Sequence, residues 1–351
     1  MNSIATLVKI LDLARWAPSG DNTQVWEFDI VAVDHVTIYC HDTRDHCVYD
    51  LHGHPSQISY GALLETLSIA ASGHGLRADV VREGDELRPV FQVRLSADPA
   101  LRPSSLIASI ERRTVQRRPL LRRPLTTAEK RALEAAVGGG FHIQWLEGPE
   151  RRRAAWLMYK NARLRLTMPE AFEVHRSIIE WDARHSLDKV PDQALGVDAM
   201  TTKLMRWAMH SWPRMKTMNT VLGTWAPRLQ MDLIPGLACA AHYVIKADRA
   251  PQTIDDYVAA GRAVQRFWLT LTGLGLLMQP EMTPLIFTSY LRQGIKFSVD
   301  PALERGARAL EGEMAALIEQ GAGYPVYMGR LGAGPQPHAR SLRKPLGQLL
   351  R

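Results

Sequence analysis

Hydrophobic residues recur along the chain with two periods, one typical of helices and one typical of strands. Residues 3–16 place Leu7, Leu11 and Ala14 on one helical face, and residues 25–33 (VWEFDIVAV) are typical of a strand. A helix over 127–137 is expected to begin at Thr126 or Thr127, with Glu129 close behind. The remaining predicted elements are strands over 36–40, 90–95, 141–146, 238–246 and 326–329 and a helix over 305–320. Helices that flank short strands predict an α+β fold in layers.

Two segments of the chain resemble each other. Residues 58–76 (ISYGALLETLSIAASGHGL) and 258–276 (VAAGRAVQRFWLTLTGLGL) each place a glycine after three residues and end in Gly-x-Gly-Leu. Each segment is expected to form a long, mostly apolar core helix that a glycine ends in the left-handed conformation. The pair indicates an internal duplication. Coincidence between two core helices is the alternative, because glycine and leucine are common.

The region between the two halves, about 151–235, has a different composition. It is helical in pattern and contains eight of the thirteen methionines and five of the nine tryptophans. Such side chains are ordinary core residues, and they also suit an adaptable apolar surface such as a lid over a flat ligand. Both interpretations stay open at this point.

Composition indicates an ordinary globular protein. The hydrophobic fraction is 46% and the charged fraction is 23%. Three cysteines are too few for a disulfide framework, so a reducing compartment is expected. No signal peptide is apparent, and the longest uncharged run, 267–280, is shorter than the roughly 20 residues that span a bilayer. We therefore expect a cytoplasmic protein with no membrane association.

The net charge of +7 is concentrated in two stretches. One contains Arg112, Arg113, Arg117, Arg118, Arg122 and Arg123, and the other contains Arg340, Arg343, Lys344 and Arg351. A polyanion would need a long basic stripe, whereas two local clusters suit a small anionic ligand. We therefore expect no nucleic-acid partner. A basic nucleic-acid-binding protein is the remote alternative.

Other combinations of reactive residues are weaker. Cys40, His41, His46, Cys47 and nearby histidines have the residue types of a zinc site, but their spacing fits no standard one. A solvent-exposed loop is the preferred interpretation, and no metal is expected. The Gly138-Gly-Gly turn lacks the strand and helix context of a dinucleotide site.

Residues 14–26 (ARWAPSGDNTQVW) resemble the signature Ala-Pro-Ser-x-x-Asn-x-Gln-Pro-Trp of the nitroreductase-like flavoproteins. The matching residues are Ala17, Pro18, Ser19, Asn22, Gln24 and Trp26, and Val25 stands where the family has proline. In that family the turn contacts FMN. The resemblance therefore implies FMN as the cofactor, with Pro18, Ser19, Asn22 and Gln24 as binding residues.

Three later segments extend the resemblance. Residues 110–118 (IERRTVQRR) look like the phosphate-binding segment, which implies roles for Arg112, Arg113, Thr114 and Arg117. The tail 340–346 (RSLRKPL) is similar to the basic segment that completes the phosphate site, through Arg340 and Arg343. Residues 274–282 resemble the stretch near flavin N5, where Met282 and Thr283 hold the contact positions and the family's Glu-Gly pair is absent.

Elementary chemistry agrees with these assignments. A phosphate monoester carries nearly two negative charges, and arginines bind its oxygens with charge-assisted hydrogen bonds of roughly 1.5–3 kcal/mol each. Taken alone, the arginine run would be a solvated basic loop. Its order relative to the other segments favours a flavin site.

The distribution of these segments implies an internal dimer. The first half contains the turn, and the second half contains the arginines and the tail, so one composite site remains. This resembles the single-chain branch of the family (Acg-type and MoeY-type), an internally duplicated pseudo-dimer with central antiparallel sheets and long core helices. We expect one nitroreductase-like half over 1–105 and another over 106–351, with a helical insertion or lid at about 151–235.

The resemblance implies an FMN-dependent NAD(P)H oxidoreductase that reduces an electron-poor molecule, such as a nitroaromatic or a quinone, by a ping-pong reaction. Its partners would be NAD(P)H and a small-molecule acceptor, and the chain would be a monomeric pseudo-dimer or a homodimer. No side chain is predicted as a catalytic acid or base, because the cofactor carries the chemistry. The alternatives are a flavin-sequestering protein without turnover and a specialised step in cofactor biosynthesis.

Overall fold

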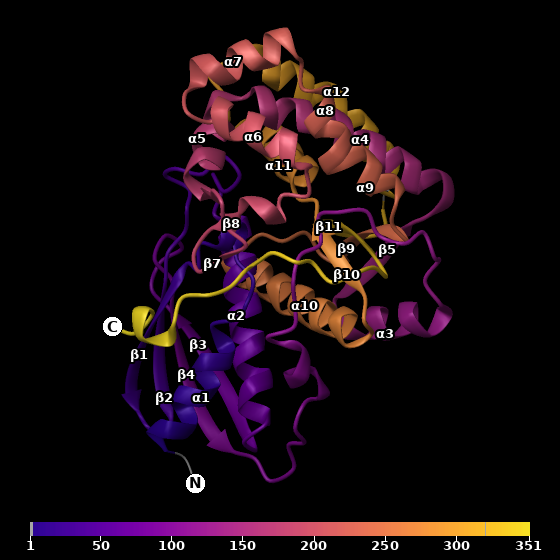
Figure 1. Cartoon of the computed structure of the whole chain (residues 1–351). Helices are drawn as coiled ribbons and strands as arrows, with labels where there is room; N and C mark the ends of the chain where they lie inside the picture. The colour runs from indigo at the N-terminus through magenta and orange to yellow at the C-terminus, as the bar shows by residue number, and fades with distance from the viewer. Residues whose placement is uncertain (1–2, 320) are drawn as a thin grey trace.

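The computed structural model describes residues 3–319 and 321–351. The described chain combines α-helices with two four-stranded antiparallel sheets and two small two-stranded sheets (Figure 1). This confirms the α+β expectation. The first part consists of α1 (Ile4–Ala14), β1 (Trp26–Ala32), β2 (His35–Cys40), α2 (His54–Ser72), β3 (Leu76–Glu83) and β4 (Val90–Ala97).

The second part repeats this order of elements around two insertions. Its elements are α3 (Thr127–Val137), β5 (Phe141–Leu146), β9 (Ala241–Ala247), α10 (Ile254–Gly273), β10 (Leu277–Pro280) and β11 (Tyr324–Gly332). The strand order is β1-β2-β4-β3 in the first sheet and β5-β9-β11-β10 in the second, which is the same order in chain sequence. In both parts the first helix packs on the second, α1 on α2 and α3 on α10.

The long helices α2 and α10 cross at their glycines. A Cβ atom added to Gly61 would lie 2.0 Å from the Val258 carbonyl oxygen, and one added to Gly261 would lie 2.0 Å from that of Ile58. The contacts are therefore reciprocal, as they are across a two-fold axis. Gly75 and Gly275 follow the two helices with φ of +66° and +74°, which confirms the left-handed glycine endings.

The two insertions form a helical layer beside the second sheet (Figure 1). The first insertion holds α4 (Gly148–Thr167), α5 (Pro169–Ile178), α6 (Ala199–Ala208), α7 (Trp212–Val221), α8 (Trp225–Arg228), a π-helical turn (Leu229–Leu233), α9 (Ile234–Leu237) and short strands β6 (Ile179–Glu180), β7 (His185–Ser186) and β8 (Val190–Pro191). The second holds α11 (Thr283–Gln293) and α12 (Pro301–Leu317), and α12 packs on α4.

Several predicted boundaries move. The helix expected over 305–320 is α12, which begins earlier at Pro301, and Gln320 lies outside the described residues. The strand expected over 326–329 is the longer β11. Strands β3 and β10 fall outside the predicted elements because each directly follows a glycine that was assigned to the helix end. Thr126 caps α3 together with Glu129, as expected.

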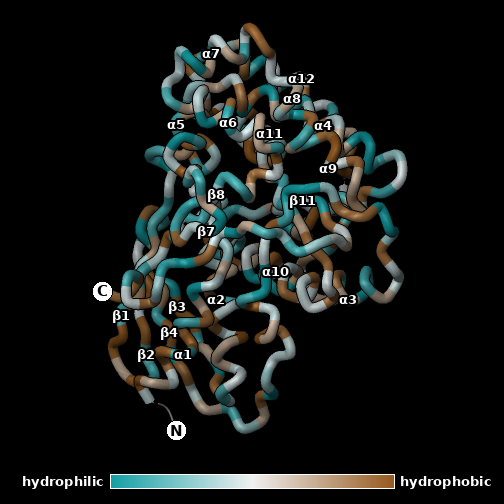
Figure 2. The backbone as a smooth tube through the Cα atoms, viewed as in Figure 1, coloured by the Kyte–Doolittle hydropathy of each residue, from teal (hydrophilic) through white to brown (hydrophobic). Residues whose placement is uncertain are grey.

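The core divides between the two parts. Figure 2 shows brown, hydrophobic stretches along β1, β2 and β4, and their inward residues pack with α1 and α2 around Trp26, Phe28 and Phe91. The second core lies around Tyr243, Phe267 and Trp268. No described helix is long and apolar enough to cross a membrane.

The C-terminal tail joins the parts. It leaves β11, pairs as β12 (Arg340–Ser341) with β7, and ends against β1, where Phe28 N–H donates to the Leu349 carbonyl at 2.7 Å. Figure 1 shows this yellow tail crossing the molecule to the first sheet. The tail therefore lies between the helical layer and the turn that precedes β1.

Candidate functional site

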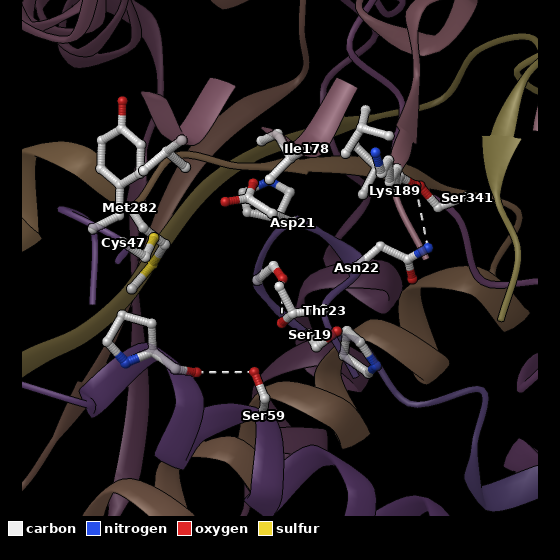
Figure 3. Close-up of a pocket in the computed structure, with 18 of the residues that line it drawn as sticks. Ser19, Asp21, Asn22, Thr23, Cys47, Ser59, Ile178, Lys189, Met282 and Ser341 are labelled. Atoms are coloured by element: carbon white, nitrogen blue, oxygen red, sulfur yellow. Dashed lines mark hydrogen bonds between the residues drawn. The ribbon is translucent and has the colours of Figure 1, made fainter. Parts of the chain in front are cut away.

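A cavity of about 700 Å³ lies where the two parts, the helical layer and the tail meet. This volume is within the range of small-molecule and cofactor sites. Its wall includes the turn from Pro18 to Thr23, the residues from Arg113 to Val115, the loop from Gln279 to Thr283 and several tail residues. Segments far apart in the sequence therefore share one enclosed surface (Figure 3).

The turn before β1 has an unusual backbone. Asp21, Asn22 and Gln24 have φ values of +49°, +66° and +52°, a region that costs non-glycine residues roughly 1–2 kcal/mol each. Ser19 stabilises the turn by accepting a hydrogen bond of 2.9 Å from the Gln24 N–H. Such strain persists only where the surroundings impose it, and it clusters at functional sites.

Contacts from distant segments impose this conformation. The Arg343 guanidinium donates to Asn22 Oδ1 at 2.7 Å, and Asn22 Nδ2 donates to the Lys189 carbonyl at 3.2 Å. Gln24 donates to the Leu187 carbonyl and accepts from the Lys344 N–H. The turn is thus held between the helical layer and the tail.

Three arginines gather beside the turn without carboxylate partners among the described residues. Arg113 donates to the Trp16 carbonyl at 2.9 Å, and Arg343 donates to the Ala17 carbonyl at 2.9 Å. Arg340 donates to the Glu111 backbone carbonyl at 2.8 Å. The Nε atoms of Arg113 and Arg340 are buried and have no hydrogen-bond partner. We call Arg113, Arg340 and Arg343 the arginine triad.

The triad raises the cost of its own positive charge. Burial and then the Arg340 guanidinium lower the pKa of Arg113 to about 9. Burial, followed by the charges of Arg113 and Arg340, lowers the pKa of Arg343 well below its ordinary value. Indole rings flank the charges, since Arg113 lies 4.4 Å from the Trp268 ring centroid and Arg340 lies 5.3 Å from that of Trp16. Unpaired buried cations are costly, so this geometry favours an anionic ligand.

Local structure explains how the arginine segment reaches the cavity. Gln116 N–H donates to the Met278 carbonyl at 2.9 Å, so the segment runs beside β10. Strand β10 leads directly into the loop that ends at Met282, the residue before α11. Both segments therefore face the cavity from one side.

The structure places most of the predicted residues together. The cavity is lined by Pro18, Ser19, Asn22, Arg113, Thr114, Arg117, Met282, Thr283, Arg340 and Arg343. Gln24 is buried behind the wall and bonds to the chain itself. Arg112 is exposed and does not line the cavity, so Arg113 is the member of that pair beside the turn.

Arg117 lies among different charges from the triad. Burial lowers its pKa to about 10, and the charges that act on it are those of Asp21, Arg330 and Arg165. The triad members act instead on one another. Within one cavity, the predicted arginines are therefore divided between two ends.

A buried charge network, not predicted from the sequence, lies behind the loop at 279–283. The Glu281 carboxylate accepts from His242 Nδ1 at 2.7 Å and from Arg330 at 2.6 Å, and all three side chains are almost fully buried. Although burial opposes it, the Glu281 charge raises the pKa of His242 to about 10. The network fixes the backbone next to Met282, and the strand pattern gives no signal for it because its members look like isolated polar residues.

The helical layer supplies the apolar part of the wall. Met158, Met205, Met209 and Met231 line the cavity, together with Leu166, Val174, Ile178, Ile179 and Leu195. The Met- and Trp-rich region contributes to its own core as well, for example around Met215 and Met218. Both interpretations of its composition therefore apply.

The cysteine and histidine group does not form a metal site in the described part of the chain. No cluster of three or more His, Cys, Asp or Glu residues with suitable geometry occurs there. His41, His46 and Cys47 line the cavity instead, and burial raises the pKa of the Cys47 thiol to about 12.

Comparison with known proteins gives two remote structural likenesses. No family model and no curated protein matches the chain. A nitroreductase-like family protein from Bacillus cereus is similar at 11% identity and a TM-score of 0.35, over 71% of this chain and 95% of that one. The FMN-dependent nitroreductase NfnB from Mycobacterium smegmatis, solved with NADPH, is similar at 13% identity and a TM-score of 0.36, over 69% and 95%. Both scores are below 0.5, so the assignment below depends on the site's own contacts.

Proposed function

We propose that the cavity binds one FMN per chain and that the protein is an NAD(P)H-dependent oxidoreductase of the nitroreductase type. The observation that carries the proposal is the arginine triad beside the strained turn. The triad offers buried N–H donors that no carboxylate satisfies among the described residues. The turn beside it is the segment that resembles the flavin-binding signature.

The residues fit a phosphate monoester. Two orphaned Nε–H groups and a cluster of positive charge provide what phosphate oxygens accept. A phosphate would also restore the pKa values of Arg113 and Arg343, because a nearby anion favours their charged forms. Thr114 is buried at the same wall and offers a further hydroxyl donor.

The remaining residues would hold and orient the ring system. Ser19 and Asn22 face the cavity beside the triad, and the loop around Met282 and Thr283 faces it from the second part. The Glu281 network keeps that loop in place. Bound FMN would supply hydride chemistry between a nicotinamide donor and an electron-poor acceptor. The protein's contribution is to bind, orient and shield.

We also infer that the two parts are copies of one ancestral unit, divided at about residue 105. Three observations support this: the identical strand order, the reciprocal contacts of Gly61 and Gly261, and the left-handed glycines that end both helices. The three-residue turn at Gly138 replaces the long turn before β1, so only one composite site has all its parts. The chain would then be a monomeric pseudo-dimer.

A second candidate is a flavin-binding protein without turnover. The helical layer favours it, because four methionines of that layer wall the cavity. Anaerobic addition of NADH or NADPH to the FMN-loaded protein distinguishes the candidates. Bleaching of the flavin absorbance supports the oxidoreductase. A persistent oxidised spectrum supports sequestration.

A further inference from the structure

The end of the cavity opposite the arginine triad contains carboxylates that are already satisfied. Asp232 accepts two hydrogen bonds of 2.6 and 2.7 Å from Arg165. Asp50 accepts from Thr43 and Ser56, and Glu281 belongs to the buried network described above. None of these three groups has its main charge free for a ligand.

Asp21 differs from them. Its side chain reaches into the cavity beside Ile178 (Figure 3), and no hydrogen bond to it occurs among the described residues. It stands at the strained position of the turn, with φ of +49° and ψ of +19°. Burial raises the pKa of its carboxyl, the Arg117 charge acts in the opposite direction, and Asp50 adds to the increase. A carboxyl in this position is unsatisfied without a ligand.

Arg117 is the second group with spare hydrogen-bonding capacity. Its guanidinium makes one long bond, 3.3 Å to the Ala194 carbonyl. Gly196, with φ of +86°, packs so closely that an added Cβ would lie 3.1 Å from Arg117 Cβ, so the stem of the arginine is fixed. No ion pair joins it to Asp21, although each charge shifts the pKa of the other. The two groups thus face the cavity as separate neighbours.

A neutral ligand edge fits such a pair better than an ion does. A carboxylate would be attracted by Arg117 and repelled by Asp21, and an ammonium ion would experience the reverse. An amide presents a carbonyl acceptor and an N–H donor side by side, which match a guanidinium and a carboxylate. The methionines and aliphatic residues around the pair suit a flat apolar ring.

We propose that Asp21 and Arg117 bind the amide edge of a planar second ligand, with Arg117 donating to the carbonyl oxygen and Asp21 accepting from the N–H. This inference rests on the proposed function, since the arginine triad takes the phosphate at the other end. Two sources carry this chemistry: the carboxamide of a nicotinamide dinucleotide and the ring of a cyclic amide acceptor.

Calorimetry on the FMN-loaded protein tests the pair with three probes: NAD⁺, nicotinate and phthalimide. We expect Asp21→Ala and Arg117→Gln each to weaken binding of NAD⁺, of phthalimide or of both by about tenfold to a hundredfold. Nicotinate, which has no N–H on its carboxylate, should bind more weakly than nicotinamide measured alongside it. The probe that responds identifies the source. Arg112→Gln, at an exposed position, should change neither affinity.

Three results would overturn the inference. Unchanged affinities for NAD⁺ and phthalimide in both variants would do so, as would nicotinate binding as tightly as nicotinamide. Loss of FMN binding in Asp21→Ala at an unchanged melting temperature would mean that the pair grips the flavin instead. If the wild-type protein takes up no FMN, the proposed function fails separately, and the probes are then titrated against the flavin-free protein by tryptophan fluorescence. Trp268 lines the cavity and would report them.

Discussion

The Arg343 guanidinium donates a 2.7 Å hydrogen bond to Asn22 Oδ1, joining residues that are 321 positions apart in the chain. The contact brings the C-terminal tail onto the turn before β1. It also places a buried positive charge beside Arg113 and Arg340. The site therefore forms only when both ends of the chain and the segment between the two sheets have folded together.

The triad makes the first prediction. Arg113→Gln should weaken FMN binding by about tenfold to a hundredfold, because it removes a charge-assisted contact to the phosphate. Arg112→Gln is the matched control, since its side chain is exposed outside the cavity. Quenching of FMN fluorescence measures both affinities. Equal losses in the two variants would argue against the triad as the phosphate site.

The strained turn makes the second prediction. Asn22→Ala loses the bond to Arg343 and also places alanine at φ +66°, whereas Asn22→Gly loses the bond without that strain. The glycine variant should therefore unfold with a free energy about 1–2 kcal/mol higher than the alanine variant. Urea denaturation measures the difference. Alanine at least as stable as glycine would contradict the assigned backbone.

The helix crossing makes the third prediction. Gly61→Ala would place a Cβ atom 2.0 Å from a backbone oxygen that has no freedom to rotate away. The free energy of unfolding should fall by about 3 kcal/mol, at the upper end of overpacking effects. Gly139→Ala is the control, because nothing lies within 4 Å of its added Cβ. A stable Gly61→Ala protein would show that α2 and α10 do not cross there.

The buried network makes the fourth prediction, through pH. The folded-state pKa of His242 is about 10, above its ordinary value near 6.5, so its stabilisation is complete below about pH 6.5 and declines as the pH rises towards 10. Glu281→Gln should destabilise the protein by about 3–5 kcal/mol at pH 6, since it leaves buried cations unpaired. The difference from wild type should shrink by pH 10.

Unfolding curves at several pH values follow this difference. The bond of Glu281 to Arg330 persists at high pH, so the two proteins should not become equal. A difference that is constant from pH 6 to pH 10 would mean that His242 is neutral in the folded protein.

Local pattern was enough to predict much of the fold, because caps, glycine endings and alternation are local. The capping box at Thr126 and the glycines after α2 and α10 are examples. The Pro18 to Asn22 turn and the arginine stretches could be identified for the same reason. Their division in space could not, since Arg112 and Arg113 are neighbours in sequence and only packing against Trp16 and Trp268 separates their roles.

The parts that were missed depend on long-range packing. Glu281, His242 and Arg330 come from different segments, and nothing in their spacing connects them. Asp21 occupies a variable position of the turn, and its exposure to the cavity depends on Arg117 and the helical layer. Such juxtapositions require the tertiary structure.

A stoichiometric titration tests the central claim most directly. Purified protein is titrated with FMN, and bound flavin is measured by absorbance after removal of the free ligand, alongside the Arg113→Gln variant. The account predicts a yellow protein with one FMN per chain, and weaker binding in the variant. No bound FMN, or two per chain, would contradict a single site built from the two ends of the molecule.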